Sequence, residues 1–189
     1  MVEFEKSCCF TGYRPEKFGF EFNNDDPKYR LFTERLIAAL TRKIEGGCTV
    51  FYTGMAKGFD IIAAEYIELI KRRNKNLKLI AVIPFNGQES GWSDDWKARY
   101  HELLKNCDEK IVLNEKYEKW VYDQRNRYMV DRCRYVLTYF DGKPGGTSNT
   151  VKYALRNCRD VINIYETDPA EEDKARFVAK FVLYPPENN

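Results

Sequence analysis

The sequence predicts an α/β domain with a mostly parallel sheet, helices on both faces and right-handed crossover connections. Strand-like segments alternate with helix-like segments along the whole chain. Residues 77–83, LKLIAVI, form a nearly continuous apolar run, as expected for a parallel strand covered on both faces. Glycine turns follow three of the expected strands. A length of 189 residues suits one domain with a full hydrophobic core, so we expect residues 1–189 to form a single domain.

The expected strands are rich in β-branched and aromatic residues. Val50, Phe51 and Tyr52 illustrate this composition, and Pro84 ends the strand that precedes it. The expected strands span residues 7–11, 49–52, 77–83, 110–113, 135–139 and 161–165. A short strand over residues 181–184 and a helix before it are expected in the tail.

The expected helices lie between these strands. The first begins at Pro27, which favours the first helical position, carries apolar residues at helical spacing and stops before Gly46 and Gly47. An irregular loop over residues 18–26 precedes it. The helices span residues 27–44, 61–73, 96–107, 122–132 and 147–157.

The composition limits the classes of partner. Lysine and arginine number 31 against 29 acidic residues, and this balanced charge of +2 argues against nucleic acid as a partner. No apolar run approaches the roughly 18–20 residues of a membrane helix, so no membrane partner is expected. The N-terminus lacks the pattern of a signal peptide, and we expect a cytoplasmic protein.

The cysteines and the one histidine do not suggest a metal site. The six cysteines form no CxxC pair, and the only histidine is His101. We therefore expect no metal cofactor and interpret the cysteines as buried free thiols.

Three glycine turns are the strongest functional signal. They contain Gly12, the pair Gly54 and Gly58, and the pair Gly145 and Gly146. The carboxyl ends of parallel strands share one edge of a sheet, where α/β proteins bind ligands, so these turns should lie together. The second turn has neither the GxGxxG spacing of a dinucleotide site nor the Gly-Lys-Ser/Thr of a P-loop.

The third turn, residues 144–150 (PGGTSNT), is the best candidate for a phosphate site. Free N–H groups at the start of a helix attract anions, and the hydroxyls of Thr147, Ser148 and Thr150 can add hydrogen bonds. The same residue types are ordinary helix caps. Both interpretations stay open, because caps and anion sites use the same N–H groups.

Several charged residues flank the turns. Arg14, held extended before Pro15, either donates to phosphate or carboxylate or lies in solvent. Arg125 and Arg127 are two positions apart on a helix, so at most one of them should reach a shared pocket. Asp60 stands where a helix cap would stand, and its alternative role is to bind the hydroxyls of a sugar.

Other side chains are weaker candidates. Glu89 is the nearest carboxylate for acid or base catalysis, while His101 lies in the middle of an expected helix. No arrangement of serine, cysteine and histidine for nucleophilic catalysis is indicated. The aromatic residues that could stack on a base are Tyr13, Phe85, Trp92 and Trp96.

Four motifs together resemble those of a known family. They are TGYRP at residues 11–15, TGMAKGFDIIAAE at 53–65, RNRYMVD at 125–131 and PGGTSNT at 144–150. Their order resembles that of the YpsA-like proteins of the SLOG superfamily, which joins Smf/DprA proteins to LOG-type nucleoside-monophosphate phosphoribohydrolases. The resemblance implies a Rossmann-like fold, a pocket for a nucleotide or a NAD- or ADP-ribose-type ligand, and a link to bacterial cell division.

One departure from the LOG-type enzymes bears on activity. Those enzymes carry P-G-G-x-G-T-x-x-E with a catalytic glutamate, whereas here Lys152 stands at the glutamate position. Arg125 and Met129 do fit their R-x-x-x-M pattern. The resemblance therefore implies a sensor or regulator that binds the ligand. A hydrolase using Glu89 or Asp60, or a DNA-binding module, are the alternatives, and a homo-oligomer stays open.

The expected ligand site draws on all three turns and their flanking charges. Its catalytic residues stay unknown. The residues expected at the site are Gly12, Arg14, Gly54, Gly58, Asp60, Arg125, Gly145, Gly146, Thr147 and Thr150.

Overall fold

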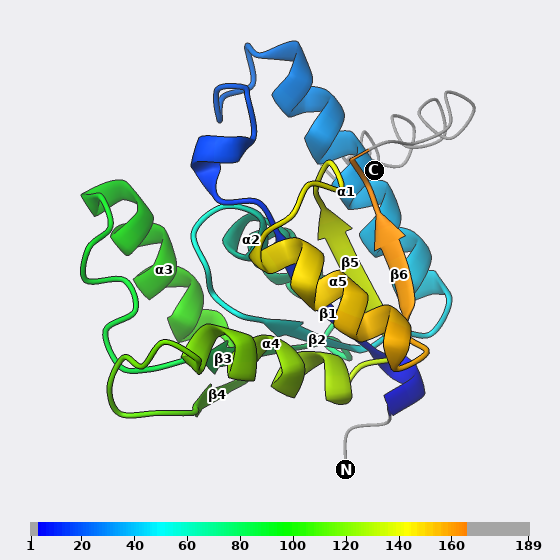
Figure 1. Ribbon diagram of the computed structural model, residues 1–189. Helices are drawn as coiled ribbons and strands as arrows, with labels where there is room; N and C mark the ends of the chain where they lie inside the picture. The colour runs from blue at the N-terminus through cyan, green and yellow to red at the C-terminus, as the bar shows by residue number, and fades with distance from the viewer. Residues whose placement is uncertain (1–3, 166–189) are drawn as a thin grey trace, which may run out of the picture.

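The computed structural model describes residues 4–165, which form a six-stranded parallel sheet with helices on both faces (Figure 1). Every neighbouring pair of strands is parallel. This confirms the predicted α/β, Rossmann-like class. The strands are β1 (Ser7–Gly12), β2 (Val50–Thr53), β3 (Lys78–Ile83), β4 (Glu109–Val112), β5 (Tyr135–Tyr139) and β6 (Asp160–Asn163).

The five α-helices agree closely with the expected ranges. Two short 3-10 helices, η1 (Phe4–Lys6) and η2 (Pro15–Lys17), accompany them. The helix and strand expected near residues 181–184 lie outside the described residues. The α-helices are α1 (Pro27–Glu45), α2 (Phe59–Lys71), α3 (Asp94–Asn106), α4 (Val121–Asp131) and α5 (Gly146–Arg156).

The two faces of the sheet are buried by different helices, as the strand pattern requires. Phe10 and Phe51 pack with α1 and α2 residues, while Cys9 and Tyr52, one position along each strand, pack against α4 and α5. Figure 1 shows α4 and α5 in front of the sheet and α2 behind it. Successive side chains of a strand point to opposite faces, so strands covered on both sides are apolar at nearly every position.

The loop before α1 is anchored by aromatic packing. Phe18 stacks on Tyr139 at 5.0 Å between ring centroids, and it contacts the Phe32 ring of α1 at 5.3 Å. Phe20 and Phe22 pack on Phe18 in turn. This cluster holds the chain that follows β1 against the end of β5, although the backbone there is irregular.

The strand order places a reversal next to β1. The order across the sheet is β4-β3-β2-β1-β5-β6. Strands β2, β3 and β4 lie in sequence on one side of β1, and β5 and β6 lie on its other side. Crossovers leaving β1 and β5 in opposite directions open a crevice between their carboxyl ends. The first and third glycine turns follow these two strands.

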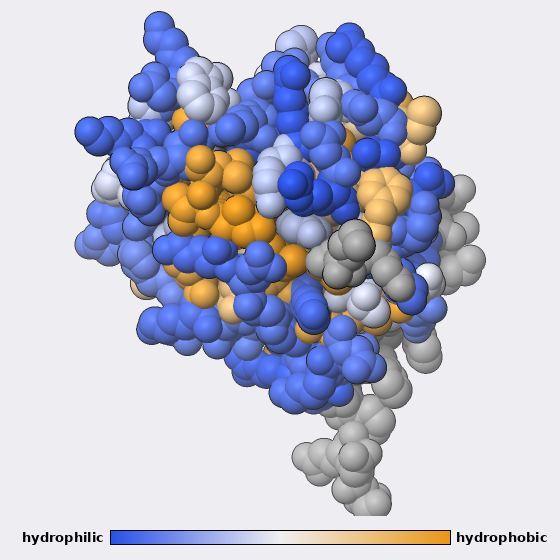
Figure 2. Space-filling view, turned by 90° about the horizontal axis from the view of Figure 1, so that it is seen from below, coloured by the Kyte–Doolittle hydropathy of each residue, from blue (hydrophilic) through white to orange (hydrophobic). Residues whose placement is uncertain are grey.

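The surface gives no sign of a membrane-spanning helix. Among residues 4–165, no helix is both long and apolar enough to cross a bilayer. Figure 2, which views the molecule from below, shows mostly polar surface with one area where apolar residues gather. Apolar atoms are common on the surfaces of folded proteins, so this area alone assigns no role.

Candidate functional site

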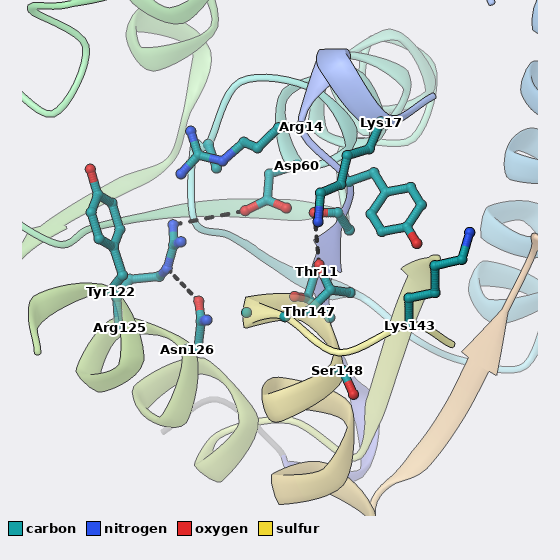
Figure 3. Close-up of a pocket in the computed structure, with 15 residues that line it drawn as sticks. Thr11, Arg14, Lys17, Asp60, Tyr122, Arg125, Asn126, Lys143, Thr147 and Ser148 are labelled. Carbon is teal, nitrogen blue, oxygen red and sulfur yellow. Dashed lines mark hydrogen bonds and ion pairs between the residues drawn. The ribbon is translucent and has the colours of Figure 1, made fainter. Parts of the chain in front are cut away.

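A pocket of about 290 Å³ lies at the reversal of strand order (Figure 3). Residues that follow β1, β2 and β5 line it together with α4 residues. The three turns therefore meet at one edge of the sheet, as predicted. The lining residues are Thr11, Gly12, Tyr13, Arg14, Lys17, Ala56, Asp60, Tyr122, Arg125, Asn126, Lys143, Gly145, Gly146, Thr147 and Ser148.

The third turn brings the N-terminus of α5 to the pocket. Gly145, Gly146, Thr147 and Ser148 all line it, and α5 begins at Gly146 without a capping side chain. Within residues 4–165, no protein acceptor takes the N–H groups of Gly146, Thr147 and Ser148. The Thr147 hydroxyl donates to the Gly12 carbonyl at 3.1 Å and so joins the first and third turns. This arrangement suits an anion at the helix N-terminus.

Thr150 lies behind this wall and does not line the pocket. Its hydroxyl donates to the Gly146 carbonyl at 3.0 Å and accepts from the Asn126 side-chain amide at 2.8 Å. The expected phosphate contact from Thr150 is therefore wrong: one helical turn beyond Gly146, the side chain points back along α5. Its role in the structure is to position Asn126, which does line the pocket.

Asp60 and Arg125 form a buried charge pair at the base of the pocket. Each residue is 4% exposed, and Arg125 Nη1 lies 3.8 Å from Asp60 Oδ2. Burial raises the pKa of Asp60, and the positive charges of Arg125 and Arg14 oppose that rise. Burial likewise lowers the pKa of Arg125, against the effect of Asp60. Each charge therefore depends on the other to be tolerated away from water.

The predicted capping role of Asp60 is wrong. Gly58, with a φ of +96°, occupies the N-cap of α2, and the helix begins at Phe59. Asp60 is therefore the second residue of the helix, and its carboxylate lies on the pocket wall. Figure 3 shows this carboxylate directed toward Arg125. Its alternative predicted role, as a ligand contact, stays a prediction.

Gly54 and Gly58 support the site without lining it. A Cβ atom on Gly54 would lie 1.9 Å from Arg125 Nη1, and this guanidinium donates a hydrogen bond to the Gly54 carbonyl. A Cβ atom on Gly58 would lie 2.4 Å from the carbonyl oxygen of Tyr13. These glycines therefore allow the second turn to pack closely against Arg125 and against the first turn.

The pocket has more cations than the sequence indicated. Arg14 and Arg125 line it as predicted, and Lys17 and Lys143 join them. Asp60 is the only carboxylate among the lining residues. In the sequence, Lys17 and Lys143 have no feature that distinguishes them from ordinary surface lysines. The one signal for a site role is their position, three residues after Arg14 and two residues before Gly145. Lys143 pairs with Asp141 at 2.7 Å and Arg125 pairs with Asp60, so Arg14 and Lys17 supply the excess of positive charge. This excess favours an anionic ligand.

The α4 residues confirm that only one of the two arginines reaches the pocket. Arg127 lies outside it and pairs with Asp123 at 2.7 Å on the surface of the helix. Arg125 also donates to the Asn126 side-chain oxygen at 2.8 Å. Tyr122, one turn before Arg125 and Asn126, lines the pocket and was not predicted from the sequence.

The predicted stacking aromatics have different surroundings. Tyr13 lines the pocket, but its hydroxyl is engaged with Asp141 and its ring packs on Tyr139. Trp92 packs on Tyr100, and Trp96 lies under Arg99, outside the pocket. Phe85 contacts Tyr122 at 5.9 Å between centroids, without lining the pocket itself.

The candidate catalytic groups do not assemble. Glu89 lies outside the pocket, with its Oε1 atom 3.7 Å from His101 Nε2. Lys152 is exposed on α5 and does not line the pocket. Among the described residues, no group of histidine, cysteine and acidic side chains could hold a metal ion. The six cysteines are free, and four of them are buried.

Comparison with known proteins identifies the family. The YpsA family model, described as YspA SLOG family, matches residues 8–168. The chain belongs to this family. The match spans the four motifs that line or support the pocket.

Relatives of this YpsA-family chain occur in bacilli. It is 30% identical over 118 residues to the SPbeta prophage-derived protein YoqJ of Bacillus subtilis (strain 168), covering 56% of this chain and 69% of that protein. It is 26% identical over 162 residues to a UPF0398 protein of Bacillus thuringiensis (strain Al Hakam), covering 85% of this chain and 88% of that protein.

Solved structures of DNA processing protein A (DprA) share the YpsA-family fold. The Streptococcus pneumoniae protein matches with a TM-score of 0.56 and 20% identity, covering 93% of this chain and 56% of that chain. The Helicobacter pylori protein matches with a TM-score of 0.54 and 18% identity, covering 94% of this chain and 78% of that chain. This chain thus spans just over half of the pneumococcal protein, and at these identities the likeness shows the fold alone.

Proposed function

We propose that this chain binds a nucleotide or a nucleotide-derived ligand, such as a molecule of the NAD or ADP-ribose type, as a sensor or regulator. The free N–H groups of Gly146, Thr147 and Ser148, facing a pocket with four cations and one carboxylate, carry this proposal. Donors of this kind favour a phosphate without requiring a metal ion. The family and the fold support a ligand-binding role.

Each part of the pocket has a distinct role in this proposal. The start of α5 holds the phosphate, and Arg14 and Lys17 add positive charge around it. The buried pair with Arg125 fixes the Asp60 carboxylate, which accepts hydrogen bonds from ribose hydroxyls. Because Lys152 replaces the catalytic glutamate of LOG-type enzymes and lies outside the pocket, binding without turnover fits the site better than hydrolysis.

Changing Gly146 to aspartate should weaken the binding of phosphate-containing ligands at least about tenfold. A Cβ atom on Gly146 would meet nothing within 4 Å, so the fold should tolerate the change, while the new carboxylate repels phosphate. Thermal-shift and calorimetric titration with AMP, ADP, NAD and ADP-ribose measure the effect. A ligand at about 100 times its dissociation constant should add about 2.7 kcal/mol of stability to the wild-type protein.

Gly91 provides the matched control. A Cβ atom there also meets nothing within 4 Å, and the residue lies outside the pocket. Gly91→Asp should bind like the wild-type protein. The proposal fails if no compound of the panel binds, or if Gly146→Asp and Gly91→Asp bind it equally well.

Hydrolysis of an N-glycosidic bond is the second candidate function, and Asp60 favours it. Burial raises the pKa of this carboxyl, which is the direction required of a general acid that protonates a departing base. In that case the wild-type protein should release free base from a nucleoside monophosphate. Asp60→Asn should lower the release at least about a hundredfold while the substrate still binds. Binding of the monophosphate without any release of base would exclude this function.

Single-stranded DNA is the third candidate, because the H. pylori neighbour is described by its single-stranded DNA binding mode. An oligonucleotide in the same panel tests it. A DNA-binding role requires affinity that falls steeply as salt is raised. The near-neutral net charge of +2 argues for a flat response.

A further inference from the structure

We propose that an aromatic platform formed by Phe85, Tyr117 and Tyr122 is the subsite for the nucleobase of the ligand. This inference rests on the proposed function and narrows it. A pocket for phosphate and sugar alone would accept any sugar phosphate, whereas a stacking surface selects ligands that carry a planar aromatic base.

The platform is assembled from three separate segments of the chain. Phe85 follows β3, Tyr117 follows β4, and Tyr122 is the second residue of α4. The ring centroids lie 5.5 Å apart for Phe85 and Tyr117, 5.9 Å for Phe85 and Tyr122, and 6.2 Å for Tyr117 and Tyr122. These are the spacings of interacting aromatic pairs. The three rings therefore form one cluster at the carboxyl edge of the sheet.

Tyr122 connects this cluster to the pocket, because it is the member that lines it. The guanidinium carbons of Arg14 and Arg125 lie 5.8 Å and 6.0 Å from its ring centroid. Figure 3 shows Tyr122 at one end of the pocket and Lys143 at the other, with Arg125 on the side of Tyr122 and Thr147 nearer to Lys143. A nucleotide with its phosphate at the start of α5 would thus extend its base toward Tyr122.

The exposure of the platform sets it apart from the aromatic core. Tyr117 is 57% exposed, and Phe85 and Tyr122 are partly exposed. By contrast, Tyr13 and Tyr139 are buried, and their rings pack together. Partly exposed aromatic rings beside a cationic pocket can bind bases by stacking, which contributes about 1–3 kcal/mol per base.

The loop that carries the platform is held in place before any ligand arrives. The side-chain amide of Asn114 donates to the Pro84 carbonyl at 2.8 Å and to the Gln124 side-chain oxygen at 2.7 Å. These bonds tie the segment after β4 to the segment after β3 and to α4. The backbone segments that carry Phe85 and Tyr117 are thereby linked to each other, and such pre-organisation favours affinity.

Comparing AMP with ribose 5-phosphate tests the subsite, because the two compounds share a phosphate and a sugar and differ by the base. The wild-type protein should bind AMP about 5- to 150-fold more tightly than ribose 5-phosphate, the factor that corresponds to one stacked base. Tyr122→Leu and, separately, Tyr117→Ala should remove most of this advantage and leave the dissociation constant of ribose 5-phosphate unchanged. Isothermal titration calorimetry measures both constants.

Tyr128→Leu is the matched control, because Tyr128 lies on the same helix, outside the pocket and outside the platform. It should alter neither constant. Equal affinity of the wild-type protein for the two compounds would overturn the base subsite while leaving the phosphate site intact. An equal loss for both compounds in Tyr122→Leu and Tyr117→Ala would overturn it as well. Failure of both compounds to bind the wild-type protein would overturn this inference together with the nucleotide-binding proposal.

Discussion

Replacing Arg125 by methionine should lower the free energy of unfolding by about 3–5 kcal/mol, the usual loss when one partner of a buried ion pair is removed. Asp60 is 4% exposed in the wild-type structure, and the variant leaves its carboxylate with no other cation within ion-pair distance among the described residues. It also removes the hydrogen bond to the Gly54 carbonyl. Urea unfolding with an unchanged m-value measures the loss directly.

The control for this prediction lies two residues further along the same helix. Arg127 pairs with Asp123 at 2.7 Å, but both side chains are 56% exposed. Its guanidinium also lies 5.0 Å from the Tyr153 ring centroid. Exposed pairs contribute about 0.3–0.5 kcal/mol and exposed cation–π contacts about 0.5–1 kcal/mol, so Arg127→Met should cost less than about 1.5 kcal/mol. Similar losses in the two variants would contradict the buried-pair argument.

The source of the Arg125→Met loss can be isolated in two ways. Adding Asp60→Asn to Arg125→Met should restore part of the free energy of unfolding, because the double variant has no unpaired buried carboxylate. Lowering the pH should also narrow the gap to the wild-type protein. Burial raises the pKa of Asp60 above its ordinary 3.8, and losing Arg125 removes a charge that opposes this rise. In the variant, the pH window above 3.8 in which the folded state binds a proton that the unfolded state does not therefore extends higher than in the wild-type protein. Stability of the single variant therefore rises as the pH falls through that window.

The fold could be predicted from the sequence because strands that are buried on both faces are apolar at nearly every position. The apolar run at residues 77–83 predicted a strand covered on both faces. Pro27 and Gly46 predicted the start and the end of α1. The order of the strands in the sheet could not be predicted from such a pattern. The crossing from β4 back to β5, beside β1, depends on which helices fit together across the sheet, and no local pattern of residues encodes it.

The site could be predicted where the backbone itself forms the binding surface. The glycine turns at Gly12 and at Gly145 line the pocket because strand ends in a parallel sheet must meet. Side chains were harder to place. Thr147 and Thr150 look equivalent in the sequence, yet one lines the pocket and the other bonds back to Gly146. The position of Tyr122 in the pocket could not be predicted, because an aromatic residue at the start of a helix usually packs against the core.

Gly58→Ala should lower the free energy of unfolding by about 2–6 kcal/mol and weaken ligand binding as well. At a φ of +96° the residue is in a conformation that side chains other than glycine rarely adopt, at a cost of about 1–3 kcal/mol. The new Cβ atom would also lie 2.4 Å from the Tyr13 carbonyl oxygen, and the backbone shift that relieves this contact should cost about a further 1–3 kcal/mol.

The comparison with Gly87 separates the strain at Gly58 from the contact it makes. Gly87 has a φ of +81°, but a Cβ atom there would meet nothing within 4 Å, so Gly87→Ala should cost only about 1–2 kcal/mol. At Gly58 the clash involves the same Tyr13 carbonyl that accepts the Phe59 N–H at 3.0 Å, so relieving it moves the first turn, including Arg14, relative to α2. Ligand titration of both variants should therefore show weaker binding for Gly58→Ala and wild-type affinity for Gly87→Ala. Equal stability and equal affinity in the two variants would mean that the close approach of the first and second turns does not shape the pocket.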